Sequence, residues 1–200
     1  MKILGLTGRV GSGKNEVAKI LHKLGAVILD AHLLGHEILE ENAVIKERVA
    51  FAFPEAYHPE TKKIDRKMLG DIVFAKHEKL LALNTIVHPA LKEIILAAIA
   101  KYRQSDEVKA VVVNGALVNE LGMRQVCDKV WAVDAETTAI MHRLKARGWN
   151  TQKALAVLSA QEPSMVYIQQ ADIVIRNSSD LDSLKHQVQS AYQKFLLGTV

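Results

Sequence analysis

The sequence predicts an α/β fold in which a parallel sheet of five strands is covered by helices on both faces. Two observations lead to this prediction. Short apolar runs alternate along the chain with segments of helical periodicity, as expected for strands buried on both faces of a sheet. A glycine-rich segment, residues 8–14, joins the first apolar run to the first helical segment. The 200 residues are 49% hydrophobic and 24% charged, which is typical of one folded domain.

Each predicted element follows from its local pattern. Strands are expected where apolar runs end at glycine or at a polar residue, over 2–7, 26–29, 108–113, 130–133 and 173–175. Helices are expected where apolar residues recur three and four positions apart, over 16–24, 31–41, 136–147, 150–161, 164–170 and 181–197, with 60–103 mostly helical. Ligands of parallel sheets bind beyond the carboxyl ends of the strands. Asp30, Asn114 and the glycine-rich segment all follow such ends.

Composition excludes several classes of protein. The 26 basic and 22 acidic residues give a net charge of +4, which is too small to indicate nucleic-acid binding and suits a polyanionic small molecule. The single cysteine, Cys127, excludes an internal disulfide and a cysteine-based zinc site. No run of 18 apolar residues is present and no secretory leader is recognisable, so neither a membrane span nor a membrane partner is expected, and the protein is expected in the cytoplasm. Monomer and weak homo-oligomer both remain open.

Residues 8–14, Gly-Arg-Val-Gly-Ser-Gly-Lys, fit the phosphate-loop pattern G-x-x-x-x-G-K between a strand and a helix. Glycines let successive N–H groups turn toward phosphate oxygens, and the lysine neutralises their charge. The alternative is a glycine-rich turn with an exposed lysine. Asn15 stands where the pattern has Ser or Thr, so weak or water-mediated metal binding is expected there. The predicted nucleotide-binding residues of this segment are Gly8, Arg9, Val10, Gly11, Ser12, Gly13, Lys14, Asn15 and Glu16.

Further motifs extend this pattern along nearly the whole chain. They are Gly5-Leu6-Thr7-Gly8, Asp30-Ala31, His88-Pro89, Arg143 with Arg147, Gln161, and Ala171-Asp172 with Asn177. In this combination the sequence resembles the dephospho-coenzyme A kinase family. The resemblance implies a P-loop kinase-like three-layer sandwich forming a single domain, residues 1–200, with a helical acceptor-binding region at about 60–105 and a helical lid at about 136–170. It also implies transfer of phosphate from ATP, with Mg²⁺, to the 3′-hydroxyl of dephospho-CoA.

Four positions depart from the family pattern, and all lie where chemistry is expected. They are Asn15; His32, in place of an aspartate; Asn114, in place of an acidic residue; and Tyr167, in place of a basic one. Neutral imidazole accepts a proton, so His32 is either a general base or a bystander beside the cleft. The predicted catalytic residues are Lys14, Asp30, His32 and Arg143, and the predicted metal ligands are Asn15 and Asp30.

The remaining candidates bind the two substrates. Arg143 and Arg147, four residues apart, are either a phosphate clamp or a solvated helix face. Asn177 either encloses adenine, as the resemblance implies, or is a turn residue. The expected acceptor-binding residues are Asp30, His32, His88, Lys92, Asn114 and Leu117. Two other functions remain open: a nucleotide- or CoA-binding protein that has lost turnover, and a P-loop kinase with a different small-molecule acceptor.

Overall fold

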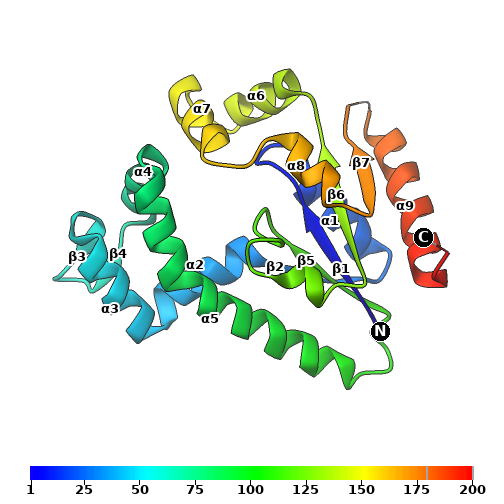
Figure 1. Ribbon diagram of the computed structural model, residues 1–200, viewed down its shortest axis with the longest axis horizontal. Coiled ribbons are helices and arrows are strands. Elements are labelled where there is room, and N and C mark those ends of the chain that lie inside the picture. Colours follow the sequence, from blue (N-terminus) through cyan, green and yellow to red (C-terminus); the bar gives the residue numbers. More distant parts are fainter. Residues whose placement is uncertain (179, 200) are drawn as a thin grey trace. The chain divides into compact units, whose positions relative to one another are not determined.

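The computed structural model describes residues 1–178 and 180–199, which form two compact units (Figure 1). The first, here called the sheet unit, comprises residues 1–30 and 95–200. The second, here called the helical unit, comprises residues 31–94. The chain therefore leaves the sheet unit directly after Asp30 and returns to it at Ile95.

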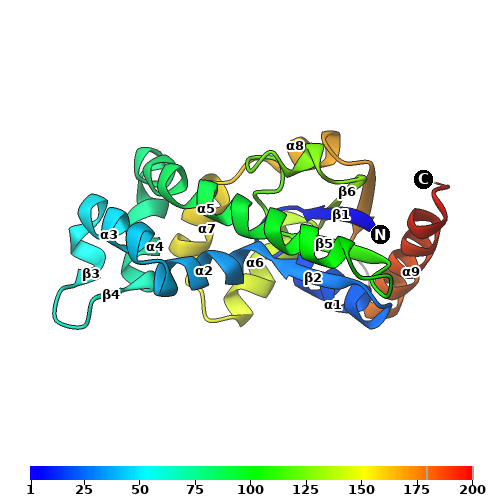
Figure 2. The same ribbon diagram turned by 90° about the horizontal axis from the view of Figure 1, so that it is seen from below.

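The sheet unit is built on five parallel strands in the order β2-β5-β1-β6-β7, and Figure 2 shows the first four succeeding one another in that order. The predicted parallel sheet is thus confirmed, with each strand within two residues of its predicted bounds. The register aligns Asp30 with Asn114 and Leu6 with Asn114, so the ends of three strands meet. The strands are β1 (Lys2–Thr7), β2 (Val27–Asp30), β5 (Ala110–Asn114), β6 (Lys129–Asp134) and β7 (Ile173–Arg176).

One face of this sheet packs against two helices that lie side by side in Figure 1, α1 (Lys14–Lys23) and α9 (Leu181–Leu197). The core on this face is centred on Trp131, which is fully buried and meets Phe195 in a T-shaped contact of 6.1 Å between ring centroids. Burial of these large side chains supplies most of the driving force for packing the helices on the sheet. The other helices lying wholly in the unit are α6 (Thr137–Ala146), α7 (Thr151–Ser159) and α8 (Ser164–Gln169).

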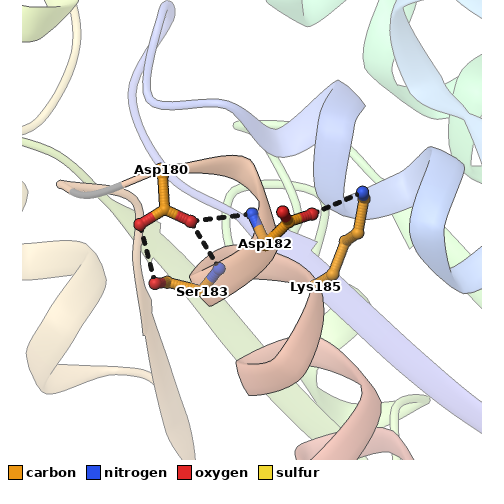
Figure 3. Close-up of polar contacts among 4 residues, drawn as sticks. All are labelled: Asp180, Asp182, Ser183 and Lys185. Carbon is orange, nitrogen blue, oxygen red and sulfur yellow. Dashed lines mark hydrogen bonds and ion pairs between the residues drawn. The ribbon is translucent and has the colours of Figure 1, made fainter.

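Helix α9 begins at a complete cap, shown in Figure 3. The Asp180 carboxylate accepts hydrogen bonds from the backbone N–H groups of Asp182 and Ser183, both at 2.9 Å, and from the Ser183 hydroxyl. Lys185 then pairs with Asp182 at 2.8 Å. An aspartate cap satisfies helix N–H groups that have no partner within the helix, which explains why the helix starts where the sequence predicts.

The helical unit contains two predicted helical regions and three elements that the sequence analysis did not predict. One of the latter, helix α3 (Ala43–Ala52), has only Ile45 and Val49 buried, so its amphipathic periodicity is weak. The unpredicted elements are α3 (Ala43–Ala52), the 3₁₀ turn η1 (Pro54–Ala56) and the hairpin of β3 (Tyr57–His58) and β4 (Lys63–Ile64). The predicted regions contain α2 (Ala31–Glu41), α4 (Arg66–Ala75) and α5 (His77–Arg103), and α5 belongs to the sheet unit from Ile95 on.

Helix α5 has 27 residues and carries the His88-Pro89 pair in its interior. By length and composition α5 is also long and apolar enough to cross a membrane, although no single run of 18 apolar residues is present. One such helix is weak evidence of a span, because core helices of soluble proteins pass the same test.

Candidate active site

The phosphate loop, residues 8–14, is held open by glycines that no other residue can replace without strain. Gly8, Gly11 and Gly13 have φ values of 135°, 76° and 108°, which favour glycine. A Cβ atom on Gly8 would lie 2.4 Å from the Val133 oxygen, and one on Gly13 would lie 2.0 Å from the Asn177 amide nitrogen. The loop therefore passes so close to its neighbours that these positions have no room for a side chain.

Two donors of the loop are already used within the protein. The Val10 N–H donates to the Gln161 side chain at 2.9 Å, and the Ser12 N–H donates to the Arg9 oxygen at 3.2 Å. The N–H groups of Gly11, Gly13, Lys14 and Asn15 have no acceptor among the residues that the structure describes. These four groups lie at the turn into α1, where the helix dipole also favours negative charge. They are the donors that remain for an anion.

Lys14 is folded back over the loop. Its ammonium donates to the Gly8 oxygen at 2.8 Å and to the Arg9 oxygen at 3.1 Å. Burial lowers the pKa of this ammonium to about 8; the Asp30 carboxylate opposes the shift and the Arg147 guanidinium adds to it. Lys14, Asp30 and Arg147 are thus close enough to interact electrostatically, as expected of groups around one phosphate site.

The two predicted arginines of the clamp differ in what they contact. The Arg143 guanidinium donates to the carbonyl oxygens of Gly11 (3.3 Å), Ser12 (3.1 Å) and Asn177 (3.0 Å). Arg147 caps the C-terminal end of α6 and is exposed. Arg143 therefore fixes the loop itself, whereas the charge of Arg147 remains available at the surface beside Lys14.

Asn177 and Arg9 also contact protein in the structure. The buried Asn177 amide donates to the Ser12 oxygen at 2.8 Å and fills the space beside Gly13. Arg9 donates to the Leu158 oxygen at 2.7 Å, which ties the loop to α7. The sequence placed both residues near the nucleotide but did not indicate these contacts, because a side chain that binds a distant carbonyl leaves no periodic pattern.

Three polar side chains meet at the ends of β2 and β5 and the start of α1. The Asn114 amide nitrogen donates to Asn15 Oδ1 at 3.2 Å and to Asp30 Oδ2 at 3.0 Å. Asn114 is 3% exposed, and its own oxygen is buried without a partner among the described residues. Three positions that sequence reasoning singled out separately are thus one hydrogen-bonded group.

Two further predicted residues, Leu117 and Glu16, lie close to Asn114 and Asn15 along the chain. Leu117 is half-buried in the turn after β5, and the neighbouring Ala116 oxygen accepts a hydrogen bond from the Thr7 hydroxyl at 3.1 Å. Glu16 lies in the first turn of α1 and pairs with the exposed Lys19 at 3.4 Å. Glu16 is therefore engaged on the outside of the helix.

The other predicted acceptor residues belong to the helical unit. His32 is exposed on α2, with its ring 4.1 Å from the His36 ring, centroid to centroid. His88 is half-buried in α5, and burial lowers its pKa. Lys92 is half-buried on the same helix. Their roles stay predictions.

The helical unit also contains a cavity of about 370 Å³ with a mainly basic lining. The Glu40 carboxylate pairs with Arg66 at 3.1 Å, and its backbone oxygen accepts from Lys46 at 2.6 Å. Lys62 and Lys63 line the same cavity. An anion is the ligand that this excess of positive charge favours.

Cys127 and Tyr167 are both buried. Cys127 is buried, and burial raises the pKa of its thiol to about 12, so the thiol is not a nucleophile. Tyr167, where the resemblance implies a basic residue, is also buried, and burial raises its pKa to about 12. A neutral, buried phenol does not supply the positive charge that a lysine or arginine would bring.

A magnesium ion fits this site only in part. Asp30 offers a carboxylate at the carboxyl edge of the sheet, and Mg²⁺ in nucleotide sites is typically held by one or two carboxylates together with phosphates. The Asn15 oxygen, in contrast, already accepts a hydrogen bond from Asn114. Within residues 1–178 and 180–199, no group of three or more His, Cys, Asp or Glu side chains is arranged to hold a metal.

Comparison with known proteins identifies the family. A family model described as dephospho-CoA kinase matches residues 2–183. Dephospho-CoA kinases from Dehalococcoides mccartyi and Carboxydothermus hydrogenoformans are 35% and 36% identical to the chain, covering 94% and 98% of it and 95% of each relative. The structure of dephospho-CoA kinase from Campylobacter jejuni superposes with a TM-score of 0.71 at 25% identity, covering 100% of both chains. The α/β fold is that of the P-loop kinases, and the chain belongs to the dephospho-CoA kinase family, whose members are ATP-dependent phosphotransferases.

Proposed function

We propose that the protein transfers the γ-phosphoryl group of ATP to the 3′-hydroxyl of dephospho-CoA. The observation that carries this proposal is the phosphate loop, with four N–H groups and the Lys14 ammonium beside it, in a chain that matches the family over residues 2–183. Phosphoryl transfer depends mainly on positioning and on neutralising developing charge, and the loop offers both.

Lys14 and three side chains outside the loop each have a part in this scheme. Lys14 exchanges its two carbonyl contacts for phosphate oxygens, and its pKa rises when negative charge arrives. Arg147 adds a second positive charge at the surface. Arg143 and Asn177 hold the Gly11–Gly13 backbone in its open shape, so they act on the nucleotide through the loop. This shape is formed before ligand binds, which lowers the entropy cost of binding.

The acceptor is proposed to approach the carboxyl ends of β2 and β5, where Asp30, Asn114 and Leu117 lie. His32 is the proposed general base for the attacking hydroxyl, and Asp30 is the proposed carboxylate on the metal side. His88 and Lys92, in the proposed acceptor-binding region of about 60–105, and the basic cavity of the helical unit favour an acceptor that carries phosphates.

We also propose a metal, a lid and a cellular setting for this reaction. Mg²⁺, held by Asp30 and the phosphates, would supply charge neutralisation on the transferred group. Residues 136–170 are the proposed lid, and they include Arg143 and Arg147. The protein is proposed to act in the cytoplasm on small molecules, without nucleic acid or membrane, as a monomer or weak homo-oligomer.

The test is product formation. Purified protein is incubated with ATP, Mg²⁺ and dephospho-CoA, and CoA is detected by mass, with Lys14→Met as the matched control. CoA formed by the natural protein and not by the control supports the proposal. ADP binding without CoA would indicate a binding protein without turnover, and ATP consumption with another acceptor would indicate a different kinase.

A further inference from the structure

The structure assigns to Asn15 a role that differs from that of the Ser or Thr of the phosphate-loop pattern: we propose that its amide NH₂ donates to a phosphate oxygen of the nucleotide, and that Asn114 sets this orientation. The usual hydroxyl at this position is a magnesium ligand. The inference rests on the nucleotide-binding part of the proposed function and specifies one of its contacts.

The orientation begins at Asp30. A carboxylate only accepts hydrogen bonds when ionised, so the atom of Asn114 that lies 3.0 Å from Asp30 Oδ2 must be its nitrogen. The reverse placement would set two oxygens against each other. This chemical argument fixes the amide, which geometry alone leaves ambiguous between oxygen and nitrogen.

The same nitrogen then orients Asn15. It lies 3.2 Å from the Asn15 side chain, and a donor must face an acceptor, so Asn15 presents Oδ1 to Asn114. The NH₂ of Asn15 is the other end of that planar amide. Asn15 is exposed at the second residue of α1, next to Lys14, where its own backbone N–H is already without an acceptor among the described residues. The Asn15 side chain thus adds an NH₂ donor beside the four backbone N–H groups at the start of α1.

The burial of Asn114 indicates that this arrangement is fixed. The side chain is 3% exposed, and its oxygen is buried without a partner in the described part of the chain. Rotating the Asn114 amide by 180° would not satisfy the side chain better, because its nitrogen would then lose both acceptors. The β2–β5 register pairs Asp30 with Asn114, so it holds these two members of the hydrogen-bonded group in place.

The two roles of Asn15 predict opposite results when metal is removed. If the NH₂ binds phosphate, Asn15→Ala weakens ADP binding in EDTA by about tenfold, as for the loss of a hydrogen bond to a charged group, and the ratio of affinities with and without Mg²⁺ does not fall. If the oxygen binds metal, Asn15→Ala leaves binding in EDTA unchanged and reduces that ratio.

Calorimetry with ADP, in EDTA and in Mg²⁺, tests the proposal on the full chain. Lys23→Ala, at the far end of α1, is the matched control and should bind as the natural protein does. Asn15→Asp keeps an oxygen and removes the NH₂, so its binding in EDTA should fall at least as far as that of Asn15→Ala. The proposal is overturned if either variant binds ADP in EDTA as tightly as the natural protein, or if the natural protein binds ADP only with metal.

A second variant tests the positioning role of Asn114. Asn114→Leu should weaken ADP binding in EDTA, and it should cause no further loss in an Asn15→Ala background, because both changes remove the same contact. Equal losses in both backgrounds would overturn the positioning role. If the protein forms CoA but Asn15→Ala leaves ADP binding in EDTA unchanged, this inference alone is refuted. If Asn15→Ala weakens ADP binding in EDTA but the protein forms no CoA, only the proposed acceptor is refuted.

Discussion

Nucleotide binding should consume a proton at mildly basic pH, because the half-buried Lys14 ammonium has a lowered pKa before ligand arrives. The pKa of Lys14 is about 8 in the free protein. A bound phosphate favours the charged ammonium, so the pKa rises on binding and the complex holds a proton that the free protein has partly lost. The affinity for ADP must therefore fall as pH increases through 8.

The magnitude follows from the protonated fraction of free Lys14, which is about 0.76 at pH 7.5 and about 0.09 at pH 9. If the bound ammonium stays charged throughout, ADP affinity falls by about eightfold over this range, and proton uptake approaches about one per ADP at pH 9. Phosphate groups titrate near pH 6, so ADP itself contributes little.

Calorimetry in buffers of different ionisation enthalpy measures both quantities at once. Lys14→Arg is the control, because a guanidinium stays charged over the whole range and should abolish the pH dependence. A constant ADP affinity between pH 7.5 and pH 9, without proton uptake, would refute the reasoning and place the ammonium in a more polar environment than its contacts indicate.

Four further substitutions test the loop, its two neighbouring arginines and the core. Gly13→Ala places a Cβ atom 2.0 Å from the Asn177 nitrogen at a φ of 108°, and should lower ADP affinity by about tenfold or more, measured by calorimetry. Arg143→Ala leaves three carbonyl oxygens without their donor and should lower the free energy of unfolding by about 1–3 kcal/mol, whereas the exposed Arg147→Ala should weaken ADP binding and change stability by less than about 0.5 kcal/mol. Equal loss of stability in the two arginine variants, measured by urea unfolding, would contradict this distinction. Phe195→Ala empties a fully buried site in the sheet core and should cost about 3–5 kcal/mol of unfolding free energy; a cost below about 1 kcal/mol would show that the core refills.

The periodic elements were predictable from the sequence, and the side-chain contacts of the site were not. Strand β5 could be predicted because Val111, Val112 and Val113 form an unbroken apolar run that both faces of a parallel sheet require. Helix α3 was missed because only two of its ten residues are buried, so its amphipathic pattern is weak.

The candidate site shows the same division. The glycine loop has a fixed spacing that local backbone geometry demands, so the sequence alone indicated it. The bonds from Asn177 to Ser12 and from Arg143 to Gly11 join residues 165 and 132 positions apart. No local rule relates such residues, so the sequence placed both near the nucleotide and could not show that they bind the loop.

Those long-range bonds have a consequence during synthesis on the ribosome. Residues 8–14 leave the exit tunnel well before residues 143 and 177, which carry two of the side chains that brace the loop. A nascent or truncated chain that stops before residue 177 has the glycines and Lys14 without their braces. Nucleotide binding can thus stabilise only a chain that extends beyond residue 177, and shorter translation products gain no stabilisation from ATP.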